Sequence, residues 1–97
     1  MHGKGEYQYS SGAKYEGDWK NGQKHGTGTF IYEDGEKYVG EFKNDLRNGR
    51  GVLETPDNKK YKGQFFQGDK HGRGTVTFAN GKTRRGEWKT GKLIKWL

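Results

Sequence analysis

Aromatic and charged residues alternate along the chain. In the segment 14–20, Tyr15, Gly17 and Trp19 occupy odd positions, whereas every even position is charged. Residues 25–32 continue the alternation, with glycine or an aromatic residue at most even positions and threonine or isoleucine at most odd ones. Because successive side chains in a strand point to opposite faces of a sheet, each segment is predicted to be a half-buried β-strand.

This pattern returns every 23 residues. The sequence His-Gly-Lys-Gly at residue 2 has counterparts that begin at residues 25, 48 and 71. The aromatic residues follow the same period: Tyr15, Tyr38 and Tyr61 share one phase, with Arg84 in the fourth place, and Trp19, Phe42, Phe65 and Trp88 share another. All 18 glycines fall on five phases, and only Asp45 and Asn58 interrupt them. Glycine at fixed positions of a repeat defines a structure rather than weakening it.

The repeat predicts an all-β fold, a single-layer twisted antiparallel β-meander ribbon of about eight strands built from 23-residue hairpin units. The predicted strands cover residues 2–9, 14–19, 25–32, 37–42, 48–55, 60–65, 71–78 and 83–88. Tight hairpin turns are predicted at Ser11-Gly12, Asp34-Gly35, Asp57-Asn58 and Asn80-Gly81. Longer charged connections are predicted at residues 20–24, 43–47, 66–70 and 89–92. No helix is predicted.

Glycine and aromatic residues on the same face can pack together across neighbouring strands. A ring from one strand then lies across the bare backbone of the next strand, an arrangement known as aromatic rescue of glycine. Eight strands would form a curved ribbon roughly 38 Å long and 20 to 25 Å wide. A single-layer sheet is expected to leave one side of its rings open.

Composition alone would place the chain near the disordered class. Hydrophobic residues make up 27%, the mean hydropathy is −1.34 and the formal net charge is +7. The single proline and the aromatic fraction of 14% argue against disorder. The absence of cysteine excludes disulfides, thiol catalysis and cysteine-ligated zinc. We expect a cytoplasmic protein, or one associated with the cytoskeleton or a membrane.

The segment 15–28 reads Tyr-Glu-Gly-Asp-Trp-Lys-Asn-Gly-Gln-Lys-His-Gly-Thr-Gly. This segment, its copies at residues 38 and 61 and a weaker copy at residue 84 resemble the MORN repeat (membrane occupation and recognition nexus). The resemblance divides a single array into a leading half-repeat (1–14), full repeats (15–37, 38–60 and 61–83), a partial repeat (84–91) and a C-terminal segment (92–97). The array departs from the repeat at Asp45, Asn48, Asp57-Asn58 and Arg84.

The resemblance implies a non-catalytic module without a cofactor. MORN arrays as a family serve as protein-interaction and self-association scaffolds, as regions beside enzymatic domains and as proposed binders of anionic phospholipids. The chemistry of the residues agrees, because Glu33-Asp34 falls in a predicted turn and Glu16 with Asp18 on a polar strand face, where carboxylates are solvated. His2, His25 and His71 share one phase with Asn48, which favours a structural hydrogen-bonding role over a metal site.

The aromatic face is the first candidate binding surface. It either forms a groove for a protein segment or is consumed in covering glycines. The candidate groove residues are Tyr15, Trp19, Phe30, Tyr32, Tyr38, Phe42, Tyr61, Phe65, Phe78 and Trp88. Exposed aromatic strips commonly mark interaction sites, and aromatic residues serve as anchors there.

Basic residues give the alternative, peripheral binding to an anionic, phosphoinositide-containing membrane. Residues 1–48 carry seven Lys/Arg and eight Asp/Glu, whereas residues 49–97 carry twelve and four. The candidate lipid contacts are Lys60, Lys62, Lys70, Arg73, Lys82, Arg84, Arg85, Lys89 and Lys92. Lys24, Arg47 and Lys70 are predicted to form a basic stripe at the loop edge. Nucleic acid is a less favoured partner, because single-strand binders interleave rings and charges in one groove, whereas Lys14 lies on the face opposite the predicted rings.

The last six residues leave the repeat pattern. Leu93, Ile94, Trp96 and Leu97 are apolar. They are predicted either to cap the last strand or to mediate self-association, since an open ribbon has an unpaired edge.

Overall fold

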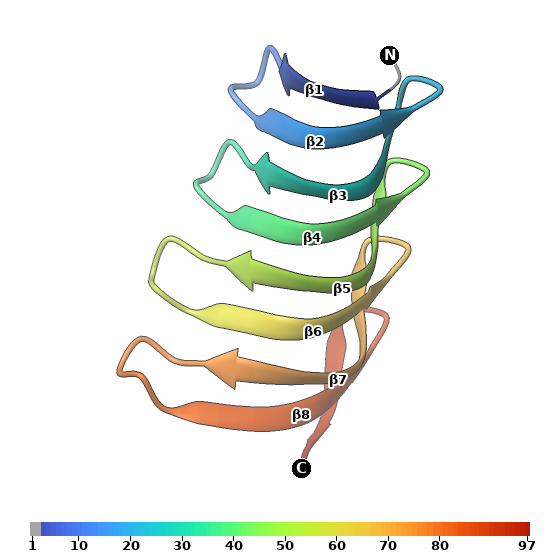
Figure 1. The fold of residues 1–97 in the computed structure, drawn as a ribbon. Helices are drawn as coiled ribbons and strands as arrows, with labels where there is room; N and C mark the ends of the chain where they lie inside the picture. Colours follow the sequence, from blue (N-terminus) through green and yellow to red (C-terminus); the bar gives the residue numbers. More distant parts are fainter. Residues whose placement is uncertain (1–2) are drawn as a thin grey trace.

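The computed structural model describes residues 3–97, which form one antiparallel sheet of nine strands paired in chain order (Figure 1). The strands are β1 (Gly3–Gln8), β2 (Lys14–Lys20), β3 (Gln23–Ile31), β4 (Lys37–Lys43), β5 (Leu46–Glu54), β6 (Lys60–Phe66), β7 (Asp69–Thr77), β8 (Thr83–Lys89) and β9 (Lys92–Trp96). Residues 3–97 contain no helix. The predicted all-β single-layer meander is confirmed, and its extents of 41 × 23 × 17 Å match the predicted ribbon closely.

A line of glycines crosses the sheet. Directly paired glycines succeed one another on neighbouring strands: Gly5, Gly17, Gly28, Gly40, Gly51, Gly63, Gly74 and Gly86. The backbones approach so closely there that a Cβ atom on Gly40 would lie 2.5 Å from the Cα atom of Gly51. At Gly17, Gly40 and Gly63 an added Cβ would lie within 2.8 Å of backbone atoms of the next strand, so only glycine fits there without displacing that strand.

The strands bend at the glycine line, and the aromatic rings fill the inside of the bend. A straight strand would place the Cα atoms of Tyr15 and Trp19 about 13 Å apart, yet their ring centroids are 5.0 Å apart. Tyr15 and Tyr38 are 0% exposed. The expectation that one side of the rings stays open is therefore wrong for the buried rings, which the bent sheet encloses, whereas Phe30, Tyr32 and Phe78 stay half-buried. We call this inner surface the ring face and the opposite surface the outer face.

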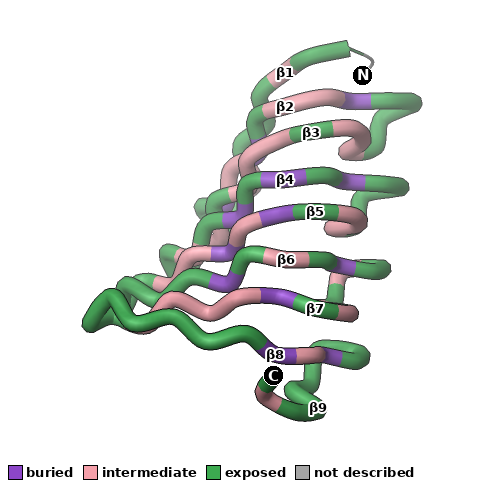
Figure 2. Tube along the Cα trace, turned by 60° about the horizontal axis from the view of Figure 1, so that its bottom comes forward, coloured by how far each residue is buried: buried purple, intermediate pink, exposed green. Residues whose placement is uncertain are grey.

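The core is built between successive repeats. Tyr15 packs edge-on against Phe42 of the next unit, with ring centroids 5.1 Å apart, and Tyr38 packs in the same way against Phe65 at 5.0 Å. The buried apolar residues are Ala13, Tyr15, Trp19, Tyr38, Phe42, Leu53, Tyr61, Phe65 and Trp88. Most of them lie on β2, β4, β6 and β8 (Figure 2).

Each buried tyrosine also ties down an irregularity in its own strand. The pairing of β2 with β3 shifts register between Gly17 and Trp19, and the hydroxyl of Tyr15 donates a hydrogen bond of 2.8 Å to the carbonyl of Asp18 there. Tyr38 and Tyr61 make the same bond in the next two units, at 2.8 and 2.9 Å. Burial raises the pKa of all three hydroxyls, that of Tyr15 to about 12.

Tight turns lie at both ends of the strands. The four predicted turns are confirmed, because the amides of Gly12, Gly35, Asn58 and Gly81 donate hydrogen bonds of 2.8 to 3.1 Å to the carbonyl three residues earlier, and all four residues have positive φ. Two-residue turns join β2 to β3, β4 to β5, β6 to β7 and β8 to β9: Asn21-Gly22, Asn44-Asp45, Gln67-Gly68 and Thr90-Gly91. Both residues of each pair have positive φ, as type I′ hairpin turns require. The other ends carry five-residue loops such as 32–36. The longer charged connections predicted at residues 20–24, 43–47, 66–70 and 89–92 are therefore wrong, because the Asn-Gly dipeptide at 21–22 is itself a strong hairpin signal.

The C-terminal segment, which was predicted to cap the last strand or to mediate self-association, forms a ninth strand. β9 pairs with β8, where Trp96 lies opposite Gly86, and the Leu97 amide donates a 2.8 Å hydrogen bond to the Arg85 carbonyl. The rings of Trp88 and Trp96 meet edge-on, 6.0 Å apart. Trp96 thus lies against the part of the ring face where Arg84 stands in place of a tyrosine.

Candidate functional site

The ten predicted groove residues divide into two groups. Seven form the buried core: Tyr15, Trp19, Tyr38, Phe42, Tyr61, Phe65 and Trp88. The other three, Phe30, Tyr32 and Phe78, are half-buried. Tyr9, Val76 and Trp96 are also half-buried and pack against the core. These three were not among the predicted groove residues, although Tyr9 has the same repeat phase as Tyr32 and Phe78. A partner at the ring face would therefore contact this half-buried group, since the core rings offer little surface.

Basic residues share the ring face with the aromatic ones. Lys24, Arg47 and Lys70 pair across the strands with Trp19, Phe42 and Phe65, respectively, so their side chains lie on the same face as those rings. We call these three residues the cation column. The column is the basic stripe predicted at the loop edge, since each member is the second residue of its strand after a two-residue turn. The sequence did not show that this stripe lies on the ring face.

The cations of the column stand over ring faces. The ammonium group of Lys24 lies 5.3 Å from the ring centroid of Phe30. The guanidinium carbon of Arg47 lies 4.9 Å from the centroid of Phe65, and the ammonium group of Lys70 lies 5.1 Å from that of Tyr61. Such cation–π contacts contribute roughly 0.5–2 kcal/mol each. The cations and the core therefore hold each other in position.

The column is neutralised at only one end. Lys24 has a carboxylate partner, the Asp45 side chain, at 3.5 Å from its ammonium nitrogen. Among the described residues, Arg47 and Lys70 have no carboxylate oxygen within ion-pair distance. Burial and the neighbouring Arg47 charge lower the pKa of Lys70. The ring face therefore combines half-buried rings with two positive charges that lack a counter-ion within the described chain.

Comparison with known families accounts for this repeating geometry. The family profile described as MORN repeat matches residues 1–14, 15–37, 38–60 and 61–83. The chain belongs to the MORN-repeat family. No curated protein matches it. MORN repeats are generally non-enzymatic repeat modules, often in protein or membrane interactions, and this chain accordingly has a repeat-scaffold architecture.

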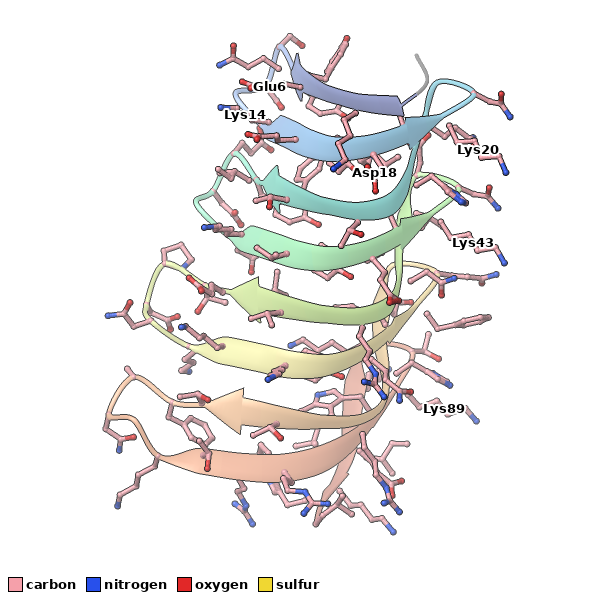
Figure 3. The ribbon with its side chains drawn as sticks, viewed as in Figure 1. Glu6, Lys14, Asp18, Lys20, Lys43 and Lys89 are labelled. Carbon is pink, nitrogen blue, oxygen red and sulfur yellow. The ribbon has the colours of Figure 1, made fainter. Side chains whose placement is uncertain are left out.

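The outer face of the MORN array is polar. Lys14 and Glu6 form an ion pair of 2.9 Å (Figure 3), and this contact raises the pKa of Lys14. The Asp18 carboxylate accepts a 3.1 Å hydrogen bond from the Thr27 amide, and Glu41 accepts an equivalent bond one repeat later. Asp18 was expected to be a solvated surface group, but it is half-buried and its carboxylate fixes the strand irregularity.

The nine candidate lipid-binding residues do not form one surface of the MORN array. Lys70 and Arg84 contact rings on the ring face, where the guanidinium carbon of Arg84 lies 4.6 Å from the Trp96 centroid. Lys62, Arg73 and Arg85 are on the outer face; Lys60 and Lys82 lie at the end with five-residue loops, and Lys89 and Lys92 flank a two-residue turn. Arg73 and Lys60 also have acidic neighbours, Glu87 at 3.8 Å and Glu54 at 3.5 Å.

The C-terminal strand of the MORN array keeps apolar side chains accessible. Leu93, Ile94 and Leu97 are exposed, whereas Trp96 is half-buried against the core. One edge of β9 pairs with β8, and the other edge has no neighbouring strand within residues 3–97. The segment therefore extends the sheet and still offers an apolar edge.

No group of three or more His, Cys, Asp or Glu side chains within residues 3–97 is arranged to hold a metal ion. His25 is half-buried on β3, and His71 packs against Phe66 with ring centroids 5.7 Å apart. His2 lies outside the described residues. The described part of the chain contains no helix that is long and apolar enough to cross a membrane.

Proposed function

We propose that this MORN array is a non-enzymatic scaffold that binds a protein segment along its ring face. The observation that supports the proposal is the row of half-buried rings in one repeat phase, Tyr9, Tyr32 and Phe78, which Thr55 interrupts, together with the cation column beside it. Phe30, Tyr32 and Phe78 present part of their surface there. Aromatic residues that are rigidly held on one side and accessible on the other are typical interface anchors.

The rigidity of this row favours binding. Tyr32 packs against Phe30 with ring centroids 4.5 Å apart, and the Arg47 guanidinium carbon lies 5.9 Å from the Tyr32 centroid. A side chain already held by its neighbours loses little conformational entropy when a partner binds. The ring face is therefore pre-organised for an extended ligand.

Selection of random displayed peptides against the protein tests this proposal. The affinity of a selected peptide is then measured by fluorescence anisotropy for the wild type, Tyr32→Ser and Phe78→Ser. Each substitution is expected to weaken binding about tenfold or more, as loss of an aromatic anchor does. The matched control is Val39→Ser on the outer face, where Val39 is 44% exposed.

Thermal unfolding establishes that each variant is folded before its affinity is compared. Selected peptides that bind Tyr32→Ser and Phe78→Ser as tightly as the wild type, but fail to bind Val39→Ser, would place the site on the outer face and contradict the proposal.

Self-association is a second form of the same scaffold role. It is supported by the exposed Ile94 and Leu97 beside the free edge of β9. If copies join there, light scattering should show a mass above that of the monomer, and Ile94→Lys with Leu97→Lys should return the mass to the monomer value. A wild-type mass equal to the monomer at all concentrations would contradict self-association.

Binding to an anionic membrane is the alternative function, and one edge of the sheet favours it. Lys20, Lys43 and Lys89 follow this edge, each as the last residue of a strand before a two-residue turn (Figure 3). Leu46 and Phe66 lie between Lys43 and Lys89 along the edge, and Phe66 is 52% exposed. Lysines around exposed apolar side chains suit a surface with anionic headgroups above acyl chains.

Sedimentation with vesicles tests the membrane alternative. Vesicles that contain a phosphoinositide should retain the wild type, and Lys43→Gln with Lys89→Gln should reduce the bound fraction more than the outer-face control Lys62→Gln does. Equal losses for the edge and control variants would indicate attraction by net charge alone and refute a membrane site at this edge.

A further inference from the structure

The first residue of the cation column shows which group such a cation binds. The carboxylate of Asp45 accepts a 2.7 Å hydrogen bond from the backbone amide of Lys24 and lies 3.5 Å from its ammonium nitrogen. Asp45 stands where the repeat otherwise has glycine, and its φ of 70° is in the left-handed region that favours glycine. The carboxylate is thus held beside Lys24 at a position where an aspartate is conformationally costly.

The next two units keep the backbone of this arrangement without the carboxylate. The amide of Asp45 donates to the Lys24 carbonyl at 3.0 Å, and the amides of Gly68 and Gly91 donate to the carbonyls of Arg47 and Lys70 at 2.8 and 3.0 Å. Gly68 and Gly91 have no side chain that could neutralise the adjoining cation. In the second unit the Arg47 guanidinium donates hydrogen bonds to the Gly68 carbonyl, which is a neutral acceptor. The units therefore share this backbone arrangement, but the anion is part of the chain only in the first.

We propose that Arg47 and Lys70 bind two carboxylates of an acidic peptide, which supplies to the second and third units what Asp45 supplies to the first. This inference rests on the proposed binding of a protein segment at the ring face and names the chemistry of that segment. The half-buried setting of both cations favours a charged partner, because an anion offsets the desolvation of a cation that has no other counter-ion.

The spacing of the column defines the conformation of the peptide. Arg47 and Lys70 occupy equivalent positions two strands apart, on β5 and β7, which corresponds to about 9.6 Å across the sheet. A polyproline II helix has three residues per turn and a rise of 3.1 Å, so its side chains repeat on one face about every 9.3 Å. The matching ligand is a polyproline II segment with an acidic residue at every third position, lying along the length of the ribbon.

A peptide fits this surface better than a single-stranded nucleic acid does. Nucleic acids that bind through rings and cations stack their bases on free ring faces. The core rings here pack edge-on against one another, as Tyr38 does against Phe42 and Phe65 at 5.1 and 5.0 Å. The Arg47 guanidinium also stands over the Tyr38 ring, 5.7 Å from its centroid. Carboxylates require only the cations, which are accessible in part.

Fluorescence anisotropy with a labelled peptide of repeated Glu-Pro-Pro units tests the inference. The peptide should bind, and the affinity should fall as salt is raised. Repeated Gln-Pro-Pro units should bind at least about tenfold more weakly. A repeated Glu-Pro peptide, which has more carboxylates but places them at the wrong interval, should also bind more weakly than Glu-Pro-Pro.

Substitutions at the glycine positions test the same contacts from the protein side. Gly68→Asp should neutralise Arg47 and weaken Glu-Pro-Pro binding about tenfold. Gly68→Asn has nearly the same shape without the charge and should retain most of the affinity. A Cβ atom at Gly68 would have only Leu46 within contact range, at 3.8 Å, so both side chains have room. The φ of 92° strains the backbone of both variants, so the comparison of Gly68→Asp with Gly68→Asn isolates the charge.

Asp45→Asn provides a gain of binding that misfolding cannot imitate. It releases Lys24 from its internal counter-ion, so a peptide long enough to reach three units should bind more tightly than it binds the wild type. Equal affinity of Gly68→Asp and Gly68→Asn for Glu-Pro-Pro, or no gain for Asp45→Asn, would overturn the inference.

The controls separate this inference from the proposed function. If selected peptides without acidic residues bind the ring face and lose affinity in Tyr32→Ser, the scaffold role holds and the acidic specificity is wrong. If a labelled oligothymidine binds the wild type more tightly than Glu-Pro-Pro does, and its affinity falls in Gly68→Asp, the column binds nucleic acid and the peptide inference is overturned.

Discussion

Gly51→Ala tests whether the close packing of a tyrosine ring on glycine contributes to the free energy of unfolding of this sheet. Gly51 is buried, and its φ lies outside the left-handed range, so alanine would fit the backbone conformation. The added Cβ would lie 2.5 Å from Cζ of Tyr38. Tyr38 cannot retreat, because its ring is 0% exposed and is packed edge-on between Phe42 and Phe65.

The expected cost of Gly51→Ala follows from two opposing effects. A carbon contact of 2.5 Å must open to about 3.5 Å or more, and such overpacking of a core costs about 1–3 kcal/mol. Alanine also restricts the unfolded chain, which returns about 0.4–1 kcal/mol. Because no neighbour of Tyr38 is free to move, we take the upper part of the range and expect a net loss of about 2 kcal/mol. That loss corresponds to a fall in Tm of roughly 10 °C.

Urea unfolding followed by circular dichroism measures this loss, with Gly86→Ala as the matched control. A Cβ atom at Gly86 would lie 3.0 Å from Leu93 and 3.1 Å from Trp88, and Leu93 is an exposed side chain that can move. Gly86→Ala should therefore cost well under half as much. If the two substitutions cost the same, the sheet relaxes around an added methyl group and the argument from close glycine packing is wrong.

Three further outcomes follow from the core and the terminal strand. Tyr61→Phe removes the 2.9 Å hydrogen bond to the Gln64 carbonyl and should lower the free energy of unfolding by about 1 kcal/mol in urea titrations. Burial raises the pKa of Tyr15 from 10.0 to about 12, so the stability it confers is complete below pH 10 and is lost as the pH rises toward 12. Circular dichroism should show unfolding together with the phenolate absorbance that the wild type has and Tyr15→Phe lacks, and appearance of that difference near pH 10 in a folded protein would contradict this. Deletion of residues 92–97 removes β9 from Trp88 and should lower Tm by several degrees, as measured by thermal unfolding.

The sequence was sufficient to predict the strands, their meander and the packing of rings on glycine, because each depends on the identity and phase of single residues. It did not show the bend of the sheet. Parity places Tyr15 and Trp19 on one face in a flat or a bent strand alike, so the burial of both rings could not be deduced. The same limit hid the cation column, since the face on which Lys24 lies depends on whether its turn has two residues or five.

The arrangement explains how so few apolar residues form a core. Each strand contributes to both sides of the bend, so the sheet supplies its own second layer, and glycine at the bend permits the approach. Because Tyr15 packs on Phe42 and Tyr38 on Phe65, every repeat completes the core of the one before it. A nearest-neighbour core of this kind can be lengthened unit by unit without a new packing solution. The ring face lengthens with each added unit. The residue at a turn position such as 45 or 68, aspartate or glycine, then determines how many cations lack a counter-ion. The number of such cations in turn sets the length of acidic ligand that can bind.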